Sequence, residues 1–336
     1  MDPVSHVSLA RALVGVLGPR DSDRPTRGTI AAGVLGALSP DIDAILMPFG
    51  WDRYLRVHEI GTHTILGTIA CALLTAGVVK SATRSQYKPL ALCAWIGAIS
   101  HVLLDLLSSA RLRPGWPFVD TVVSLPAVAM ADPWLLALCA AGGLCFWLVN
   151  NVRAAKIVLG ATIVFLLAKA AAGTVAVAAY RIERDRTGEP VHARAIEAQW
   201  GSLTRWRVVD RTANHLRVWR TATGEQAQIS FTWPLENEDA LIARSRSLST
   251  VQNFLRAHQL VFAGVVAAPG NGRYVLWSDI RFCWDPDAPS APQLEPFVRS
   301  HEAGRVACAL WFGGEFDASG NPVREIVKIA GFTQTR

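Results

Sequence analysis

The stretch ALCAWIGAISHVLLDLL, residues 91–107, decides the fold of this chain. It is largely apolar, but His101 and Asp105 stand four residues apart near its end. Because side chains at this spacing share one face of a helix, the stretch predicts an apolar helix that presents an imidazole and a carboxylate together. Counted from Pro89, the run approaches the roughly 20 residues that cross the hydrocarbon of a bilayer.

Three further runs are rich in Ala, Leu, Val, Ile and Gly, and they occupy residues 62–80, 133–149 and 156–180. Two shorter apolar segments, residues 7–17 and 28–38, precede them, and neither is long enough to cross a bilayer. No comparable run follows Arg181. We therefore expect residues 1–180 to form an α-helical membrane bundle of about six helices, four of which span the membrane.

Residues 181–336 have a different pattern. Polar residues alternate with β-branched or aromatic ones in residues 205–210, 216–220 and 226–233, which predicts a meander of antiparallel strands. One helix over residues 238–258 and further strands are expected after it, at residues 261–266, 274–284, 306–312 and 325–329. The predicted fold class is thus a helical membrane bundle followed by a small α+β, antiparallel-strand-rich soluble domain.

Several functional classes find no support in the composition. The net charge of +6 comes from scattered Lys and Arg, so no specific nucleic-acid partner is indicated. Gly-rich phosphate loops, nucleophile elbows and Cys-His pairs are absent from the sequence. Cys283 and Cys308 could pair only if their domain faces an oxidising compartment. The seven tryptophans after Arg181 are expected in the core, with a sugar- or lipid-binding surface as the alternative.

A set of His and Asp residues lies in the apolar N-terminal part of the chain, where such polar residues are unexpected. In an up-and-down bundle all of them fall at one end, whereas Lys and Arg gather at the other. The set comprises Asp2, His6, Asp41, Asp43, His58, His63, His101 and Asp105. Imidazole and carboxylate ligands together suit zinc, with manganese or iron as alternatives, and an open coordination position would admit a water molecule.

Each member of the set also has a simpler interpretation. His101 and Asp105 could hydrogen-bond to each other and join two helices. The Asp-Ile-Asp segment could end a helix or form a turn, and the N-terminal pair could be exposed terminal residues. The coincidence of the whole set at one end favours a metal site over these separate explanations.

Five short motifs are shared with a known family. They read DPVSH at residues 2–6, SPDID at 39–43, HEIGTHT at 58–64, HVLLD at 101–105 and WPFVD at 116–120. In this order they resemble the bacterial family of membrane-bound, metal-dependent hydrolases, also described as LexA-regulated or YdjM-like inner-membrane hydrolases. The resemblance covers residues 1–180 and implies a helical, membrane-embedded domain that holds a divalent metal.

More remotely, the set resembles the all-helical zinc phospholipases C and single-strand nucleases, which bind zinc with a His-x-x-x-Asp pair like His101 and Asp105. This resemblance implies that a metal-activated water hydrolyses a phosphoester or phospholipid. A second His-x-x-x-Asp/Glu motif is not evident in the sequence, so we expect one or two metals rather than three.

The resemblance and the chemistry of the residues together suggest roles. Direct ligands are expected to be His63, His101, Asp105 and Asp43, and a second ion is expected at His6 and Asp41, with Asp2 as a further ligand. His58 is expected to act as a ligand or a proton shuttle, and Asp41 to take part in catalysis beside it. Three arginines at the same end could clamp a phosphate oxygen or instead meet lipid headgroups: Arg53, Arg111 and Arg113. The two interpretations merge if the substrate is a phospholipid.

The distribution of basic residues predicts the orientation. Short loops carry eight Lys and Arg at the far end and four at the site end, and the count becomes five against four if the loop over residues 19–27 lies elsewhere. By the positive-inside rule we expect a multi-pass inner-membrane protein with its site and C-terminal domain outside the cytoplasm. The expected partners are membrane lipid and a phospholipid or other phosphoester substrate, and the sequence indicates no oligomeric state.

A second hypothesis is a non-catalytic membrane protein, such as a metal-ion transporter or a scaffold with a structural metal site. A transporter is expected to hold ionisable residues near the bilayer midplane. Here they cluster at helix ends, and Lys169 is the clear exception. This distribution favours a hydrolase at the membrane surface.

Overall fold

The computed structural model describes residues 2–19, 25–50, 54, 57, 58, 60–149, 151–235, 239–283, 297–300, 304–329 and 332–335. The chain forms two compact units. The first comprises Met1–Gly50, Tyr54–Ala176 and Glu197–Trp206, and the second comprises Val177–Ile196 and Arg207–Arg336. The segment 197–206, which the sequence analysis assigned to the soluble domain, thus lies with the first unit.

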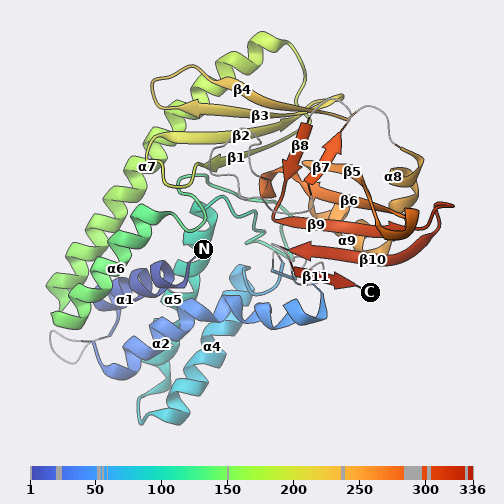
Figure 1. The fold of residues 1–336 in the computed structure, drawn as a ribbon. Coiled ribbons are helices and arrows are strands. Elements are labelled where there is room, and N and C mark those ends of the chain that lie inside the picture. Colours follow the sequence, from blue (N-terminus) through green and yellow to red (C-terminus); the bar gives the residue numbers. More distant parts are fainter. Residues whose placement is uncertain are drawn as a thin grey trace. The chain divides into compact units, whose positions relative to one another are not determined.

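Helices make up most of the first unit (Figure 1). Their bounds are α1 Pro3–Leu17, α2 Arg27–Leu38, α4 Ile65–Ala82, α5 Tyr87–Leu107, α6 Pro133–Leu148 and α7 Val152–Thr187, and the 3-10 helix η1 Ser39–Phe49 continues α2. Side-chain caps determine where several of them begin. Asp2 accepts a hydrogen bond from the backbone N of Ser5 in α1, and Thr64 accepts one from Gly67 in α4. The predicted helical bundle is confirmed.

Within the described ranges, four helical segments are long and apolar enough to cross a membrane, as predicted. Three of them are the predicted spans in α4, α5 and α7, but the fourth is Arg27–Phe49 rather than α6, which ends after 16 residues. The difference arises at Pro40. Instead of ending α2, this proline occupies the first turn of η1, where its missing N–H is tolerated, and the helix continues to Phe49.

Glycines let α2 and α5 cross closely. At Gly97 of α5, a Cβ would lie 2.1 Å from the carbonyl oxygen of Gly33 in α2. At Gly36 of α2, a Cβ would lie 2.2 Å from the carbonyl oxygen of Ala94 in α5. No side chain fits at such distances, so the crossing requires glycine at both positions. It brings the end of α5 beside η1, and these two elements carry four of the predicted ligands.

The segment Glu197–Trp206 is held in the first unit by buried polar contacts. Lys169 of α7 is 3% exposed, and its Nζ donates a hydrogen bond of 2.7 Å to the carbonyl of Ser202 and lies 3.7 Å from Asp132, the N-cap of α6. The indole of Trp206 lies 5.1 Å from the same ammonium and donates a hydrogen bond of 2.9 Å to the carbonyl of Pro126. Lys169 therefore faces protein, as a charge within an apolar helix requires.

Antiparallel sheets form most of the second unit, which confirms the strand-rich prediction, although strand residues 197–198 and 205–206 fall in the first unit. One sheet pairs β1 to β4 in sequence order, with the bounds β1 Ala193–Ala198, β2 Arg205–Arg211, β3 His215–Ala222 and β4 Gln228–Pro234. The other has the order β11-β10-β9-β6-β5, with the bounds β5 Val261–Ala267, β6 Arg273–Asp279, β9 Leu310–Phe316, β10 Pro322–Ile329 and β11 Phe332–Thr335. A hairpin is formed by β7 Phe297–Ser300 and β8 Gly304–Ala307.

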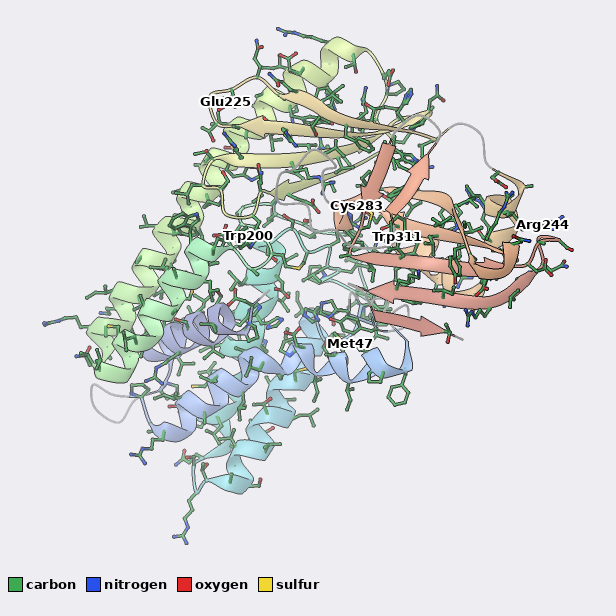
Figure 2. All side chains as sticks on the ribbon, in the orientation of Figure 1. Met47, Trp200, Glu225, Arg244, Cys283 and Trp311 are labelled. Atoms are coloured by element: carbon green, nitrogen blue, oxygen red, sulfur yellow. A yellow bond between two sulfur atoms is a disulfide. The ribbon has the colours of Figure 1, made fainter. Side chains whose placement is uncertain are left out.

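Both larger sheets contribute to one core. Trp233 of β4 and Trp311 of β9 are 3% and 1% exposed within it, and the disulfide-bonded Cys283 and Cys308 line the same cluster. Of the described tryptophans after Arg181, all but Trp200 are buried; Trp200, labelled in Figure 2, is 69% exposed. Trp284 lies outside the described residues. The single helix predicted over residues 238–258 is two shorter ones, α8 Ala240–Ser245 and α9 Ser249–Ala257.

Candidate metal centre

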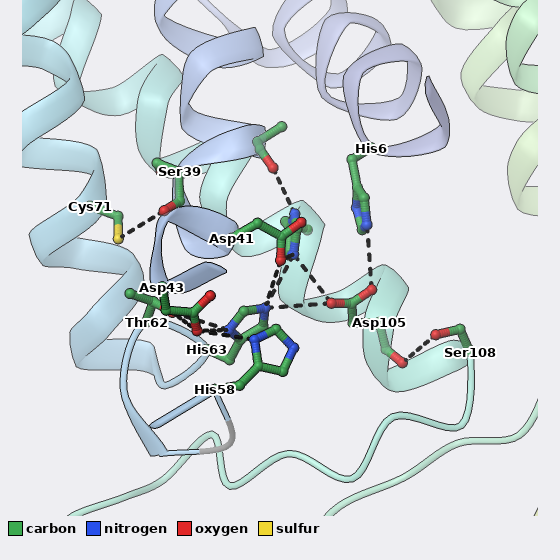
Figure 3. A network of polar contacts seen from close by, with 12 residues as sticks. His6, Ser39, Asp41, Asp43, His58, Thr62, His63, Cys71, Asp105 and Ser108 are labelled. Carbon is green, nitrogen blue, oxygen red and sulfur yellow. Dashed lines mark hydrogen bonds and ion pairs between the residues drawn. The ribbon is translucent and has the colours of Figure 1, made fainter. Parts of the chain in front are cut away.

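Helix ends bring most of the predicted His and Asp residues together (Figure 3). The start of α1, η1, the residues before α4 and the end of α5 all contribute. Two groups have ligand atoms within 4.8 Å of one another: one is His6, His101 and Asp105, and the other is Asp41, His58 and His63. Six of the eight predicted residues therefore share one cluster, which we call the metal centre.

Four atoms in the middle of the metal centre are spaced like the ligands of a single ion. Nε2 of His63 and Nε2 of His101 lie 3.2 Å apart. Oδ1 of Asp41 lies 3.6 and 3.5 Å from these two nitrogens, and Oδ2 of Asp105 lies 3.5 and 3.2 Å from them. Tetrahedral ligands about 2.05 Å from a zinc ion would be about 3.3 Å apart. The observed distances lie close to that value, so one ion fits between the four atoms.

Hydrogen bonds on the far side of each ring determine which imidazole nitrogen carries the proton. Nδ1 of His101 lies 2.6 Å from the carbonyl oxygen of Ala37, which can only accept, so Nδ1 is the donor. His58 donates likewise from Nδ1 to Oδ2 of Asp43 over 3.0 Å. Neutral rings bound in this way hold an unprotonated Nε2, the form in which histidine binds a metal.

A short relay orients His63 in the same sense. The hydroxyl of Thr62 donates to Oδ2 of Asp43 over 3.0 Å, so its oxygen accepts from Nδ1 of His63 at 3.1 Å. His63 and His101 consequently direct two Nε2 lone pairs at each other across 3.2 Å. Two such lone pairs repel unless a proton or a cation lies between them.

His6 extends the metal centre toward a second ion. Its ring is 1% exposed and stacks on His101 with centroids 3.8 Å apart. Nε2 of His6 lies 3.4 Å from Oδ1 of Asp105, and neither ring nitrogen has a hydrogen-bond partner among the described residues. The two oxygens of Asp105 thus face different histidines, so each oxygen could help to hold an ion.

The charge balance of the metal centre also calls for cations. Two carboxylates, those of Asp41 and Asp105, belong to it and that of Asp43 lies beside it, and those of Asp43 and Asp105 are buried. Burial lowers the pKa of His63, but its hydrogen bonds to Asp105 and Asp41 outweigh burial and leave the pKa above its ordinary value. Buried carboxylates are unfavourable unless paired with positive charge, which protons or metal ions can supply. Imidazole and carboxylate donors together fit zinc, manganese or iron, so the residues present suit a divalent ion.

Asp43 was expected to be a direct metal ligand, but its Oδ2 lies behind the histidines instead of among the converging atoms. Its Oδ2 binds the histidines on their Nδ1 side, so this oxygen orients His58 and, through Thr62, His63. Its Oδ1 is buried without a hydrogen-bond partner in the described part of the chain and remains available to an ion or a water molecule. The role of Thr62 was not anticipated, although the residue stands inside the HEIGTHT motif beside His63.

The other predicted residues that the structure describes lie outside the metal centre. Both carboxylate oxygens of Asp2 accept hydrogen bonds from Ser5, so Asp2 caps α1 instead of joining the ligands. Arg113 forms an ion pair with Asp120 on the loop after α5. Arg111 is half-buried on the same loop. Arg53 lies outside the described residues.

Comparison with known proteins identifies the first unit. No curated protein and no solved structure matches the chain. A family model described as YdjM inner membrane protein matches residues 1–179, which include every residue of the metal centre. With its long apolar helices, the chain is a membrane protein. Because the match extends over more than half of its 336 residues, the chain belongs to the YdjM inner membrane protein family.

Proposed function

We propose that this protein is a membrane-bound, metal-dependent hydrolase that cleaves a phosphoester bond. The observation that carries the proposal is the pair of Nε2 atoms of His63 and His101, which face each other at 3.2 Å between carboxylate oxygens of Asp41 and Asp105. Four converging donors of this kind support a site built for a divalent cation. Zinc is the metal we favour, with manganese or iron as alternatives.

Openness on one side distinguishes the metal centre from a purely structural site. The side chains of His6, His63 and His101 are fully buried, whereas those of Asp41 and His58 are 40% and 22% exposed. A substrate would therefore approach past Asp41 and His58. A divalent ion bound here would polarise a phosphate oxygen and make a water molecule easier to deprotonate.

His58 is placed to move a proton at the open side. Since Nδ1 is held by Asp43, Nε2 is free to accept a proton from the attacking water, and the negative charge of Asp43 stabilises the resulting imidazolium. The water oxygen forms a new bond to phosphorus while the ester P–O bond breaks. The proton on Nε2 then passes to the leaving ester oxygen, which returns His58 to its neutral form.

We further propose that the metal centre and the C-terminal domain lie outside the cytoplasm. The excess of Lys and Arg at the opposite end of the bundle supports this orientation. The pairing of Cys283 with Cys308 supports it independently, because disulfides persist mainly in oxidising compartments. In intact cells, a membrane-impermeant protease should cleave the C-terminal domain, and protection until the membrane is broken would contradict this orientation.

Metal content and hydrolysis measured together test the function. The purified protein should contain a stoichiometric divalent metal by elemental analysis and should hydrolyse a phosphodiester. The double variant His101→Ala/Asp105→Ala should lose both. A control variant, His192→Ala/Asp185→Ala, changes the same residue types outside the metal centre and should keep both. Absence of bound metal even after reconstitution would contradict the proposal, and metal without turnover on any phosphoester would leave only a structural site.

A further inference from the structure

The metal centre lies at the depth where the membrane-spanning helices end. Asp41 lies in the C-terminal half of the candidate span Arg27–Phe49. His63 stands two residues before the span in α4, and Asp105 stands two residues before the end of the span in α5. Helix ends of this kind mark the boundary between hydrocarbon and headgroups, where the phosphates of bilayer lipids also lie. A phospholipid therefore carries its phosphate at the level of the metal centre.

The 3-10 helix η1 places apolar side chains directly beside the open side of the metal centre. Asp41 and Asp43 point toward the histidines (Figure 3). Ile42 and Ile45, on the same helical segment, are 65% and 70% exposed. Asp41, the most exposed carboxylate of the cluster, thus adjoins exposed apolar side chains. An ester phosphate that reaches Asp41 can keep its attached chains against these isoleucines.

A second apolar surface stands on the loop after α5. Trp116, Phe118 and Val119 at the tip of this loop are 39%, 82% and 55% exposed, although they lie outside the candidate spans. Large apolar side chains exposed on a loop mark a surface that contacts a membrane or another apolar partner. The continuity of this loop with the spanning helix α5 indicates the membrane.

Hydrogen bonds hold the tip of this loop in place. The backbone nitrogens of Phe118 and Val119 each donate a 3.0 Å hydrogen bond to the carbonyl of Gly115. The carbonyl of Pro114 accepts a hydrogen bond of 2.9 Å from the backbone nitrogen of Ile65, the first residue of α4. The apolar tip is therefore attached two residues from His63. We call Ile42, Ile45, Trp116, Phe118 and Val119 together the apolar lip.

We propose that the substrate of the metal centre is a phospholipid of the bilayer, whose acyl chains stay against the apolar lip while its phosphate enters the centre. This inference rests on the proposed hydrolase function and adds the class of substrate. A water-soluble phosphoester would make no use of exposed isoleucine, tryptophan and phenylalanine at the entrance. A lipid makes use of both features, since its phosphate and its acyl chains meet at this depth.

The inference is tested by measuring the hydrolysis of two substrates by the unchanged protein and by two variants. The protein is reconstituted in phosphatidylcholine and phosphatidylglycerol vesicles, and release of the lipid headgroup or phosphate is measured beside hydrolysis of soluble bis(p-nitrophenyl) phosphate. The variant Phe118→Asp/Val119→Asp should lower vesicle phospholipid turnover by about tenfold or more, since it removes an apolar contact comparable to one or two buried side chains. Its metal content and its turnover of the soluble ester should match the unchanged protein. Val323→Asp, which alters a 59% exposed apolar residue of β10, should change neither activity.

The other outcomes separate this inference from the proposed function. If the unchanged protein hydrolyses the soluble ester and leaves vesicle phospholipid intact, the hydrolase function stands and the phospholipid inference is wrong. Equal loss of both activities in the lip variant would also overturn it, because the lip would then serve only the structure of the metal centre. Hydrolysis of neither substrate by metal-loaded protein would overturn the function and the inference together.

A physical measurement checks the lip without relying on turnover. A fluorophore attached at Phe118→Cys should be quenched by lipids brominated on their acyl chains, whereas the same fluorophore at Val323→Cys should not. The free cysteines are buried or partly buried, so labelling of the unchanged protein provides the background. Equal quenching at the two positions, or none at Phe118→Cys, would show that the lip does not enter the acyl region and would refute the inference.

Discussion

Replacing Asp43 with asparagine tests how the histidines of the metal centre are oriented. The change keeps the size of the side chain but removes its charge and replaces one oxygen with a donor. In the structure, Oδ2 of Asp43 accepts from Nδ1 of His58 and from the hydroxyl of Thr62, each over 3.0 Å, and Thr62 in turn accepts from His63. Asp43→Asn therefore weakens the support of two of the four histidines without removing a nitrogen that would face a bound ion.

The expected magnitude follows from these two hydrogen bonds. A hydrogen bond to a charged group contributes about 1.5–3 kcal/mol and one between neutral groups about 0.5–1.5 kcal/mol, so each bond loses about 1 kcal/mol when the carboxylate becomes an amide. Two such losses amount to about 2 kcal/mol, which raises the dissociation constant of the metal about 30-fold. This value lies within the roughly 10–100-fold effect typical of residues that orient metal ligands.

Competition with a chromogenic chelator in detergent measures the zinc affinity directly. Thr62→Val interrupts only the relay to His63 and should produce about half of the effect in free energy. Asp185→Asn, at an exposed position outside the metal centre, is the matched control and should leave the affinity unchanged. An Asp43→Asn affinity within twofold of the unchanged protein would refute the orienting role. Complete loss of binding, as in His101→Ala, would instead make Asp43 a direct ligand through Oδ1.

Three other variants test separate parts of the structure. His6→Ala should lower the metal content by one ion per chain, because Nε2 of His6 faces Oδ1 of Asp105, whereas His63 and His101 face Oδ2. Elemental analysis that finds an unchanged content would exclude a second ion at His6. Asp132→Ala should lower the midpoint of thermal unfolding in detergent more than Lys169→Met. Either change leaves one buried charge without its partner, at a cost of about 3–5 kcal/mol, but Asp132→Ala also removes the N-cap of α6, which contributes about 1 kcal/mol. In the C-terminal domain, burial alone would raise the pKa of Asp279, but the charge of Arg281 and the hydrogen bond from His258 outweigh it and lower the pKa. The stabilisation from Asp279 should be complete above about pH 4 and be lost as the pH falls below that value, so tryptophan fluorescence should show a weaker acid dependence of unfolding in Asp279→Asn.

The order of the helices and the clustering of six of the eight His and Asp residues could be predicted from the sequence. Apolar runs of sufficient length predict spans because the thickness of the hydrocarbon sets a minimum length for a helix. The spacing of His101 and Asp105 places both on one face of α5, which depends only on the period of the helix. In an alternating bundle the sequence position of each polar residue also indicates the end at which it lies. These are local properties, and neighbouring residues determine them.

Other features depend on packing between segments that are distant in sequence. The extension of α2 through Pro40 to Phe49, and the early end of α6, changed which helices are long enough to span. Likewise, only the structure shows that the segment 197–206 joins the first unit, where the buried Lys169 donates a hydrogen bond to it. The length of the apolar runs and the charges along the chain did not indicate these helix ends or the place of residues 197–206. Both features depend on contacts with another element.

The sequence thus determined which side chains are available to bind a metal, whereas the tertiary structure decided how their atoms are arranged. Close approach at Gly97 of α5 lets the carbonyl of Ala37 reach Nδ1 of His101, which turns Nε2 toward His63. Asp2 and Asp43 are the same residue type in equally suggestive motifs, yet one caps a helix and the other orients histidines. The physical reason is that a carboxylate binds the donors that the fold places within about 3 Å of it, and residue type and spacing do not specify those donors.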